Sequence, residues 1–130
     1  MKKVVLDTNV IVSAIFSPNG KCSKILDMVF TDKIQICYSI DILSEYKDVL
    51  SRPSLALNPG KKNLLFMILG ESGIPVSPVA STIALPDESD RVFYDTAKES
   101  GAVLITGNTK HFPMEDFIVT PSCFLELFLR

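Results

Sequence analysis

The apolar run Val4–Leu6, which ends abruptly at Asp7, constrains the fold more than any other feature of the sequence. A short, continuous apolar run is typical of a strand that is buried on both faces, as in a parallel sheet. In open parallel α/β sheets, ligands bind outside the carboxyl ends of the strands. We therefore expect Asp7 to stand at that edge of a parallel sheet and to point into a crevice.

The rest of the chain alternates between helical and strand patterns. Apolar periodicity and helix-end signals predict helices over residues 9–16, 21–30, 40–51, 59–72, 91–100 and 122–129, with Asn58 as an N-cap and Gly73 as a C-cap. Strands are predicted over residues 4–6, 34–38, 102–106 and 117–120, whereas the two prolines in 74–79 favour an edge strand or an extended loop. This alternation predicts one domain in which helices cover a parallel sheet.

Charge and cysteine content exclude several classes of protein. The 130 residues carry a formal net charge of −2, so binding to nucleic acid would need a local basic patch or a metal ion. The cysteines Cys22, Cys37 and Cys123 form no zinc-binding spacing, which favours a reducing compartment. The sequence shows no signal-peptide pattern and no apolar run that is long enough to span a membrane. We therefore expect a cytoplasmic protein.

Four polar residues are predicted to meet at the carboxyl edge of the sheet. Asp7 ends the first strand, and Glu45 lies about one turn into the helix that follows the second strand. Asp90 stands at the start of the helix that precedes strand 102–106, and Asn108 follows that strand. Clustered carboxylates repel one another, so they usually persist around a cation. Because the ligands offer only oxygen, the pattern indicates Mg²⁺ or Mn²⁺.

Neighbouring polar residues are assigned supporting roles. Asp95 lies five residues after Asp90, roughly 140° around a helix, so we expect a structural role for it. Asp87 is expected to cap the helix or to act as an outer-sphere metal partner, and Glu88 is a further acidic residue that competes for the ligand assignment. Thr106 and Asn9 are expected to position ligands or water by hydrogen bonds. The basic candidates for phosphate contacts are Arg91, Lys110, Lys21, Lys24, Arg52 and His111. If His111 does not contact phosphate, we expect it to be a plain loop residue.

With these residues identified, the chain resembles the PIN-domain nucleases, and more narrowly the bacterial PIN proteins that serve as toxin components of toxin–antitoxin pairs (VapC-like ribonucleases). The matching stretches are VVLDTNVIVSAIFSPNG, YSIDILSEYKDVLSRP, PDESDRVFYDTAKESGAVLITGN and IVTPSCFLELF. They cover almost the whole chain in order. The resemblance implies a three-layer α/β/α fold with a central, mostly parallel sheet of four to five strands.

The resemblance also implies a function. In this family, four acids hold Mg²⁺ or Mn²⁺ for hydrolysis of RNA phosphodiester bonds, and the first three fall on Asp7, Glu45 and Asp90. The fourth acid falls on Asn108, which keeps a carbonyl oxygen but lacks the negative charge. We therefore expect a weakened metal site. The resemblance further implies an RNA substrate and a cognate antitoxin protein that covers the acidic groove.

Two alternative functions remain open at this point. A haloacid-dehalogenase-type phosphatase would use Asp7 as its nucleophile, but it needs an acid/base two residues later, where this chain has Asn9. The second is a non-catalytic module that binds RNA or protein through a decayed site, an alternative that Asn108 keeps open. The apolar C-terminus also predicts a homodimer contact through Phe124, Leu127, Phe128 and Leu129.

Overall fold

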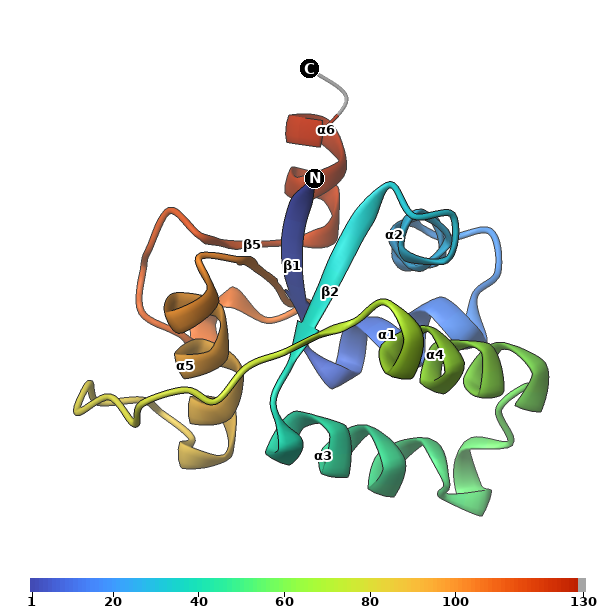
Figure 1. Cartoon of the computed structure of the whole chain (residues 1–130), viewed down its shortest axis with the longest axis horizontal. Helices are drawn as coiled ribbons and strands as arrows, with labels where there is room; N and C mark the ends of the chain where they lie inside the picture. Colours follow the sequence, from blue (N-terminus) through green and yellow to red (C-terminus); the bar gives the residue numbers. More distant parts are fainter. Residues whose placement is uncertain (129–130) are drawn as a thin grey trace.

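The computed structural model describes residues 1–128 as a parallel sheet between two layers of helices (Figure 1). The sheet has five strands in the order β3-β2-β1-β4-β5, and every neighbouring pair is parallel. The strands are β1 (Lys2–Leu6), β2 (Ile34–Tyr38), β3 (Ile74–Pro75), β4 (Val103–Ile105) and β5 (Ile118–Val119). The expected three-layer α/β/α architecture is therefore confirmed.

Six α-helices are described around this sheet. They are α1 (Thr8–Phe16), α2 (Lys21–Phe30), α3 (Ile40–Leu50), α4 (Pro59–Glu71), α5 (Arg91–Ser100) and α6 (Pro121–Phe128). In Figure 1, α5 lies on one side of β1 and β2, and α1, α2 and α4 lie on the other. Helix α3 lies beyond the carboxyl end of β2. This arrangement places α3 and α5 around the edge of the sheet where Asp7 follows β1.

The core is built on the central strand. Val4, Val5 and Leu6 have no exposed surface, because β1 is paired on both sides and covered on both faces. Amphipathic helices complete the core, and α3 buries Ile42, Tyr46 and Leu50 on one face. The end of the N-terminal apolar run is thus fixed in the middle of the molecule, and Asp7 is fixed with it.

Most predicted element boundaries agree with the structure to within one or two residues. Asn58 is the N-cap of α4, since its side-chain oxygen accepts a hydrogen bond from the backbone N–H of Gly60 at 2.8 Å. The predicted edge strand at 74–79 is reduced to β3, which pairs with β2 and then continues as an extended chain past α5 (Figure 1, yellow). The segment is therefore an edge strand in its first two residues and an extended loop in the rest, so each of the two predicted alternatives describes part of it.

The predicted role of Gly73 as a C-cap is wrong. Ser72 caps α4, and Gly73 does not have the positive φ of a left-handed cap. A Cβ at position 73 would lie 2.6 Å from the carbonyl oxygen of Leu69 and 2.9 Å from Cε1 of Tyr38. Glycine is required here because the chain passes too close to α4 and to Tyr38 for any side chain.

The C-terminal helix uses part of its apolar surface internally. Phe124 is 2% exposed and stacks on Phe128 with ring centroids 6.0 Å apart, so Phe124 is not available for the predicted dimer contact. Leu127 is half exposed, and Leu129 lies outside the described residues. The helices within residues 1–128 are all too short or too polar to cross a membrane.

Candidate metal centre

Asp7 stands at the carboxyl edge of the sheet, between β1 and the first turn of α1. Its backbone N–H donates to the carbonyl oxygen of Ile105 at 3.0 Å, which extends the pairing of β1 with β4. The side chain is 8% exposed, and its Oδ2 accepts a hydrogen bond from the hydroxyl of Thr106 at 2.8 Å. The predicted supporting role of Thr106 thus has a structural basis, because this hydroxyl fixes the carboxylate.

Glu45 reaches the same edge from α3. The phenol of the next residue, Tyr46, donates to the carbonyl oxygen of Leu6 at 2.5 Å and so ties α3 to the end of β1. The carboxylate of Glu45 accepts a hydrogen bond from the hydroxyl of Thr8, which directly follows Asp7. Thr8 and Tyr46 were not predicted as site residues. They place Glu45 next to the strand end that carries Asp7.

Asp90 enters from the opposite helical layer. It lies where the 3₁₀ turn Glu88–Asp90 passes into α5, and its side chain is only 15% exposed. Oδ2 is buried and has no hydrogen-bond partner among the described residues, although Nδ1 of His111 lies 3.4 Å from it. A buried carboxylate oxygen without a donor is costly, and either a proton or a bound cation would relieve that cost.

Asn108 follows β4 and closes the group. Its backbone N–H donates to the hydroxyl oxygen of Thr106 at 3.1 Å, and its side-chain Nδ2 lies 2.9 Å from Nε2 of His111. His111 was expected to be a plain loop residue, but it contacts both Asn108 and Asp90. The spacing of three residues, which a 3₁₀ turn brings onto one side, is the sequence signal that could have revealed this.

Burial and neighbouring groups shift the pKa values of Asp7 and Asp90. Burial raises the pKa of Asp7, against the effects of the Thr106 hydroxyl and the backbone amides of Asn9 and Thr8. Burial also raises the pKa of Asp90, and the negative charges of Asp7, Asp87 and Glu45 add to the effect. Asp7 and Glu45 likewise add to burial in raising the pKa of Tyr46 well above its usual value. The acids therefore share one electrostatic environment in which a cation would be favourable.

The donor set fits a hard divalent cation. The donor atoms that Asp7, Glu45, Asp90 and Asn108 offer are oxygens, which suit Mg²⁺ or Mn²⁺, and Oδ2 of Asp90 is buried without a hydrogen-bond partner among the described residues. Within residues 1–128, however, no three His, Cys, Asp or Glu side chains are grouped closely enough to form a ready metal centre. The mutual repulsion of the carboxylates gives a physical reason for this spacing.

The other acidic candidates have structural contacts of their own. The Asp87 carboxylate accepts a hydrogen bond from the backbone N–H of Ser89 at 2.9 Å, so it caps the 3₁₀ turn Glu88–Asp90 that leads into α5 and not α5 itself. Asp95 is buried and accepts from the backbone N–H of Ser81 at 3.2 Å. Glu88 binds the guanidinium of Arg91. These contacts hold the extended chain before α5 and support the position of Asp90.

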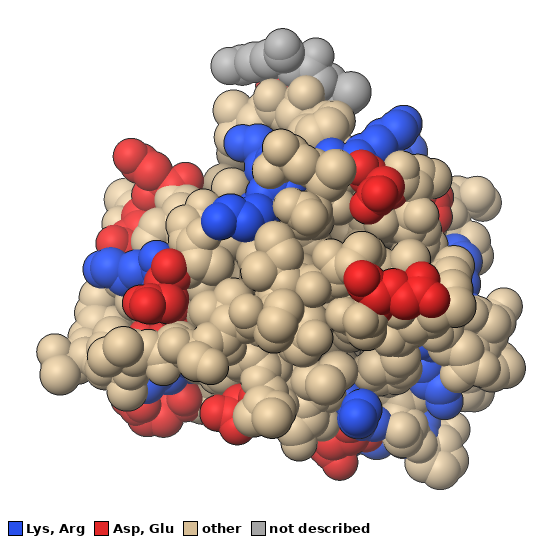
Figure 2. Space-filling view, viewed as in Figure 1, with Lys and Arg blue, Asp and Glu red and all other residues tan. Residues whose placement is uncertain are grey.

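Three of the six basic candidates for phosphate contacts are engaged elsewhere. The guanidinium of Arg91 donates to the carboxylate of Glu88 and to the carbonyl oxygens of Ser81 and Ile83, so it clamps the extended segment. Arg52 pairs with Asp48 at the surface. Lys21 donates to the hydroxyl of Ser122 at 2.8 Å and, with Lys24 and Lys33, borders a groove between α2 and α6. On the face drawn in Figure 2, basic and acidic side chains are interspersed.

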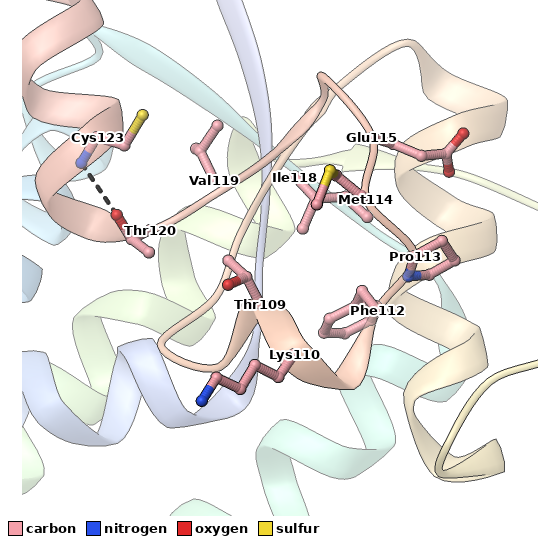
Figure 3. A pocket seen from close by; sticks show the side chains of 10 residues that line it. All are labelled: Thr109, Lys110, Phe112, Pro113, Met114, Glu115, Ile118, Val119, Thr120 and Cys123. Carbon is pink, nitrogen blue, oxygen red and sulfur yellow. Dashed lines mark hydrogen bonds between the residues drawn. The ribbon is translucent and has the colours of Figure 1, made fainter.

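Two hollows border the loop that follows β4. One, of about 370 Å³, is bounded by Asn9, Ser13, Cys22 and Asn108, and the backbone N–H of Gly107 there donates to Oδ1 of Asn9 at 3.3 Å. The other, of about 410 Å³, lies between the loop after β4 and the start of α6, where Phe112, Met114, Ile118 and Val119 surround it (Figure 3). Only the first includes a candidate ligand, so it is the hollow that adjoins the acidic group.

Comparisons with known proteins agree with this architecture. A family model described as a PIN domain matches residues 3–110. An uncharacterized protein of Methanocaldococcus jannaschii is 36% identical over 117 residues, which cover 88% of this chain and 76% of that protein.

A solved structure shares the fold. The crystal structure of VapBC2 from Rickettsia felis, bound to a DNA fragment from its promoter, matches with a TM-score of 0.55 and 19% identity. The match covers 91% of this chain and 96% of that chain. At this sequence identity, the structural match shows only a shared fold. The match to the PIN-domain model argues against the haloacid-dehalogenase-type phosphatase. The chain belongs to the PIN-domain family.

Proposed function

We propose that this protein is a metal-dependent endoribonuclease of the toxin type. The observation that carries the proposal is the buried, unpaired Oδ2 of Asp90, which lies in the electrostatic environment of Asp7 and Glu45. The family relationship supports it. The chain is net negative, so a bound cation would also explain how an acidic pocket receives a polyanion.

In this proposal, Asp7, Glu45, Asp90 and Asn108 hold Mg²⁺ or Mn²⁺. Such an ion activates water and stabilises the charge that develops on the phosphorus. Thr106 keeps the carboxylate of Asp7 oriented, and Thr8 does the same for Glu45. The hollow beside Asn108 leaves room for the nucleotide chain.

Titration with Mn²⁺ by calorimetry, combined with cleavage of a mixed RNA pool, tests the proposal. Wild type should bind and cleave, Asp7→Asn should do neither, and Asp116→Asn, which changes an exposed loop carboxylate, should behave as wild type. Absence of binding by wild type would contradict the proposal. It would favour a non-catalytic PIN module that binds RNA or protein, an alternative that Asn108 and the lack of a ready metal centre within residues 1–128 support.

We also propose a cognate antitoxin that covers the acidic edge, because the structural neighbour is a VapBC2 complex. Expression of wild type in a bacterial host should arrest growth, and expression of Asp7→Asn should not. Co-expression of the antitoxin should relieve the arrest. The predicted homodimer would use the exposed Leu127, so light scattering of Leu127→Lys against wild type tests that contact.

A further inference from the structure

His111, the single histidine of the chain, stands between two of the candidate ligands. Asn108 is the N-cap of the 3₁₀ turn Thr109–His111, and the backbone N–H of His111 donates to the carbonyl oxygen of Asn108 at 3.1 Å. The turn brings the imidazole into contact with the Asn108 side chain. Nε2 then lies 2.9 Å from Nδ2 of Asn108, and Nδ1 lies 3.4 Å from Oδ2 of Asp90.

The chemistry of these atoms fixes the direction of each contact. The amide nitrogen of an asparagine has hydrogens and no lone pair, so Nδ2 of Asn108 can only donate. Nε2 of His111 must therefore accept, and a neutral ring then carries its proton on Nδ1. Nδ1 lies 3.4 Å from Oδ2 of Asp90 without a hydrogen bond to it, so that buried oxygen has no hydrogen-bond partner among the described residues.

We propose that His111 is a positioning residue that orients the Asn108 amide. With Nδ2 held by the ring, the carbonyl Oδ1 is the atom of Asn108 that can turn toward the carboxylate group. Without this contact, the amide could present its NH₂ group, which repels a cation. The orientation itself is independent of the proposed function, and its consequence for metal binding rests on that function.

The tautomer of the ring tests the orientation without any metal. Because the chain has one histidine, a two-bond ¹H–¹⁵N spectrum of labelled protein at about pH 8, where an ordinary imidazole is neutral, reports this ring alone. We expect the proton on Nδ1. In Asn108→Ala, which removes the donor, the ring should shift toward the Nε2–H form. A wild-type ring with its proton on Nε2, or on both nitrogens, would overturn the proposal.

Mn²⁺ affinity tests the consequence. His111→Gln keeps one acceptor and one donor, whereas His111→Phe keeps neither, and the half-exposed position tolerates both. We expect His111→Phe to weaken Mn²⁺ binding about tenfold, as the loss of outer-shell partners typically does, and His111→Gln to restore most of it. Thermal unfolding of both variants controls for folding.

A double-mutant cycle separates positioning from a general structural effect. In an Asn108→Asp background, either side-chain oxygen can face the cation, so His111→Phe should cost much less affinity than in wild type. An equal loss in both backgrounds would overturn the proposal, as would no loss in either. If wild type bound no Mn²⁺, the proposed function would fail, and the ring tautomer would still decide the orientation.

Discussion

The hydroxyl of Tyr46 donates a hydrogen bond to the backbone carbonyl oxygen of Leu6 at 2.5 Å, and both residues are fully buried. This contact joins the middle of α3 to the last residue of β1. Glu45 precedes Tyr46, and Asp7 follows Leu6, so the contact brings two candidate ligands to the same place. A single buried hydrogen bond thus couples the packing of the core to the geometry of the site.

Tyr46→Phe should lower the free energy of unfolding by about 1–2 kcal/mol, because it removes a buried hydrogen bond and leaves a carbonyl oxygen poorly satisfied. Urea denaturation measures the change. Tyr38→Phe is the matched control, since Tyr38 is only partly buried and its hydroxyl has no protein partner among the described residues. Equal effects of the two substitutions would contradict the importance of the contact.

Asp7→Asn should stabilise the protein at neutral pH in the absence of divalent cations. Burial raises the pKa of Asp7 from its ordinary value of 3.8, so the folded state binds more protons than the unfolded state just above that pH. The stability of wild type therefore falls as the pH rises through this range, while asparagine contributes no such loss. The difference in unfolding free energy between Asp7→Asn and wild type should grow as the pH rises from about 4 to neutrality and then level off.

Thermal unfolding with a chelator present, at a series of pH values, measures this difference. Asp87→Asn is the contrasting control, because hydrogen bonding at Ser89 lowers the pKa of Asp87 and its carboxylate is exposed. That substitution should bring no gain at neutral pH. If wild type were more stable than Asp7→Asn at neutral pH, burial of the charged Asp7 carboxylate would not destabilise the folded protein.

Gly73→Ala should destabilise the protein by about 2 kcal/mol or more, because the new methyl group would collide with the backbone of α4 and with Tyr38. Gly70→Ala, three residues earlier and inside α4, meets no atom within 4 Å and should stabilise the protein by about 0.5–1 kcal/mol. Chemical denaturation of the pair distinguishes close packing from simple helix propensity. Similar effects of both substitutions would contradict the explanation.

The difference between these two glycines illustrates which features could be predicted from the sequence. Element type and order follow from local periodicity, so the sheet, its helices and the strand end at Asp7 were predictable. Gly73 was misassigned because its role depends on close contacts with the backbone of Leu69 and with Tyr38, and Tyr38 is 35 residues away and approaches only in three dimensions.

The same reason explains the gaps in the predicted site. Asp7, Glu45, Asp90 and Asn108 were predicted because parallel strands and the helices after them share one edge. The hydroxyl of Thr8, the phenol of Tyr46 and the ring of His111 act through individual contacts across that edge. Arg91 was considered for phosphate binding because its charge is visible in the sequence, whereas its bonds to Ser81 and Ile83 are not.

Asn108→Asp should tighten Mn²⁺ binding about tenfold, because it adds a negative charge to an oxygen-only ligand set, and ligand charge is a main determinant of affinity for hard cations. The substitution also removes the donor to His111, so the ring would have to carry a proton on Nε2 to pair with the new carboxylate. Calorimetry on wild type, Asn108→Asp and Asn108→Ala measures the three affinities. We expect the tightest Mn²⁺ binding with Asp at position 108, weaker binding with Asn and the weakest with Ala. Unchanged binding in Asn108→Asp would place position 108 outside the metal site.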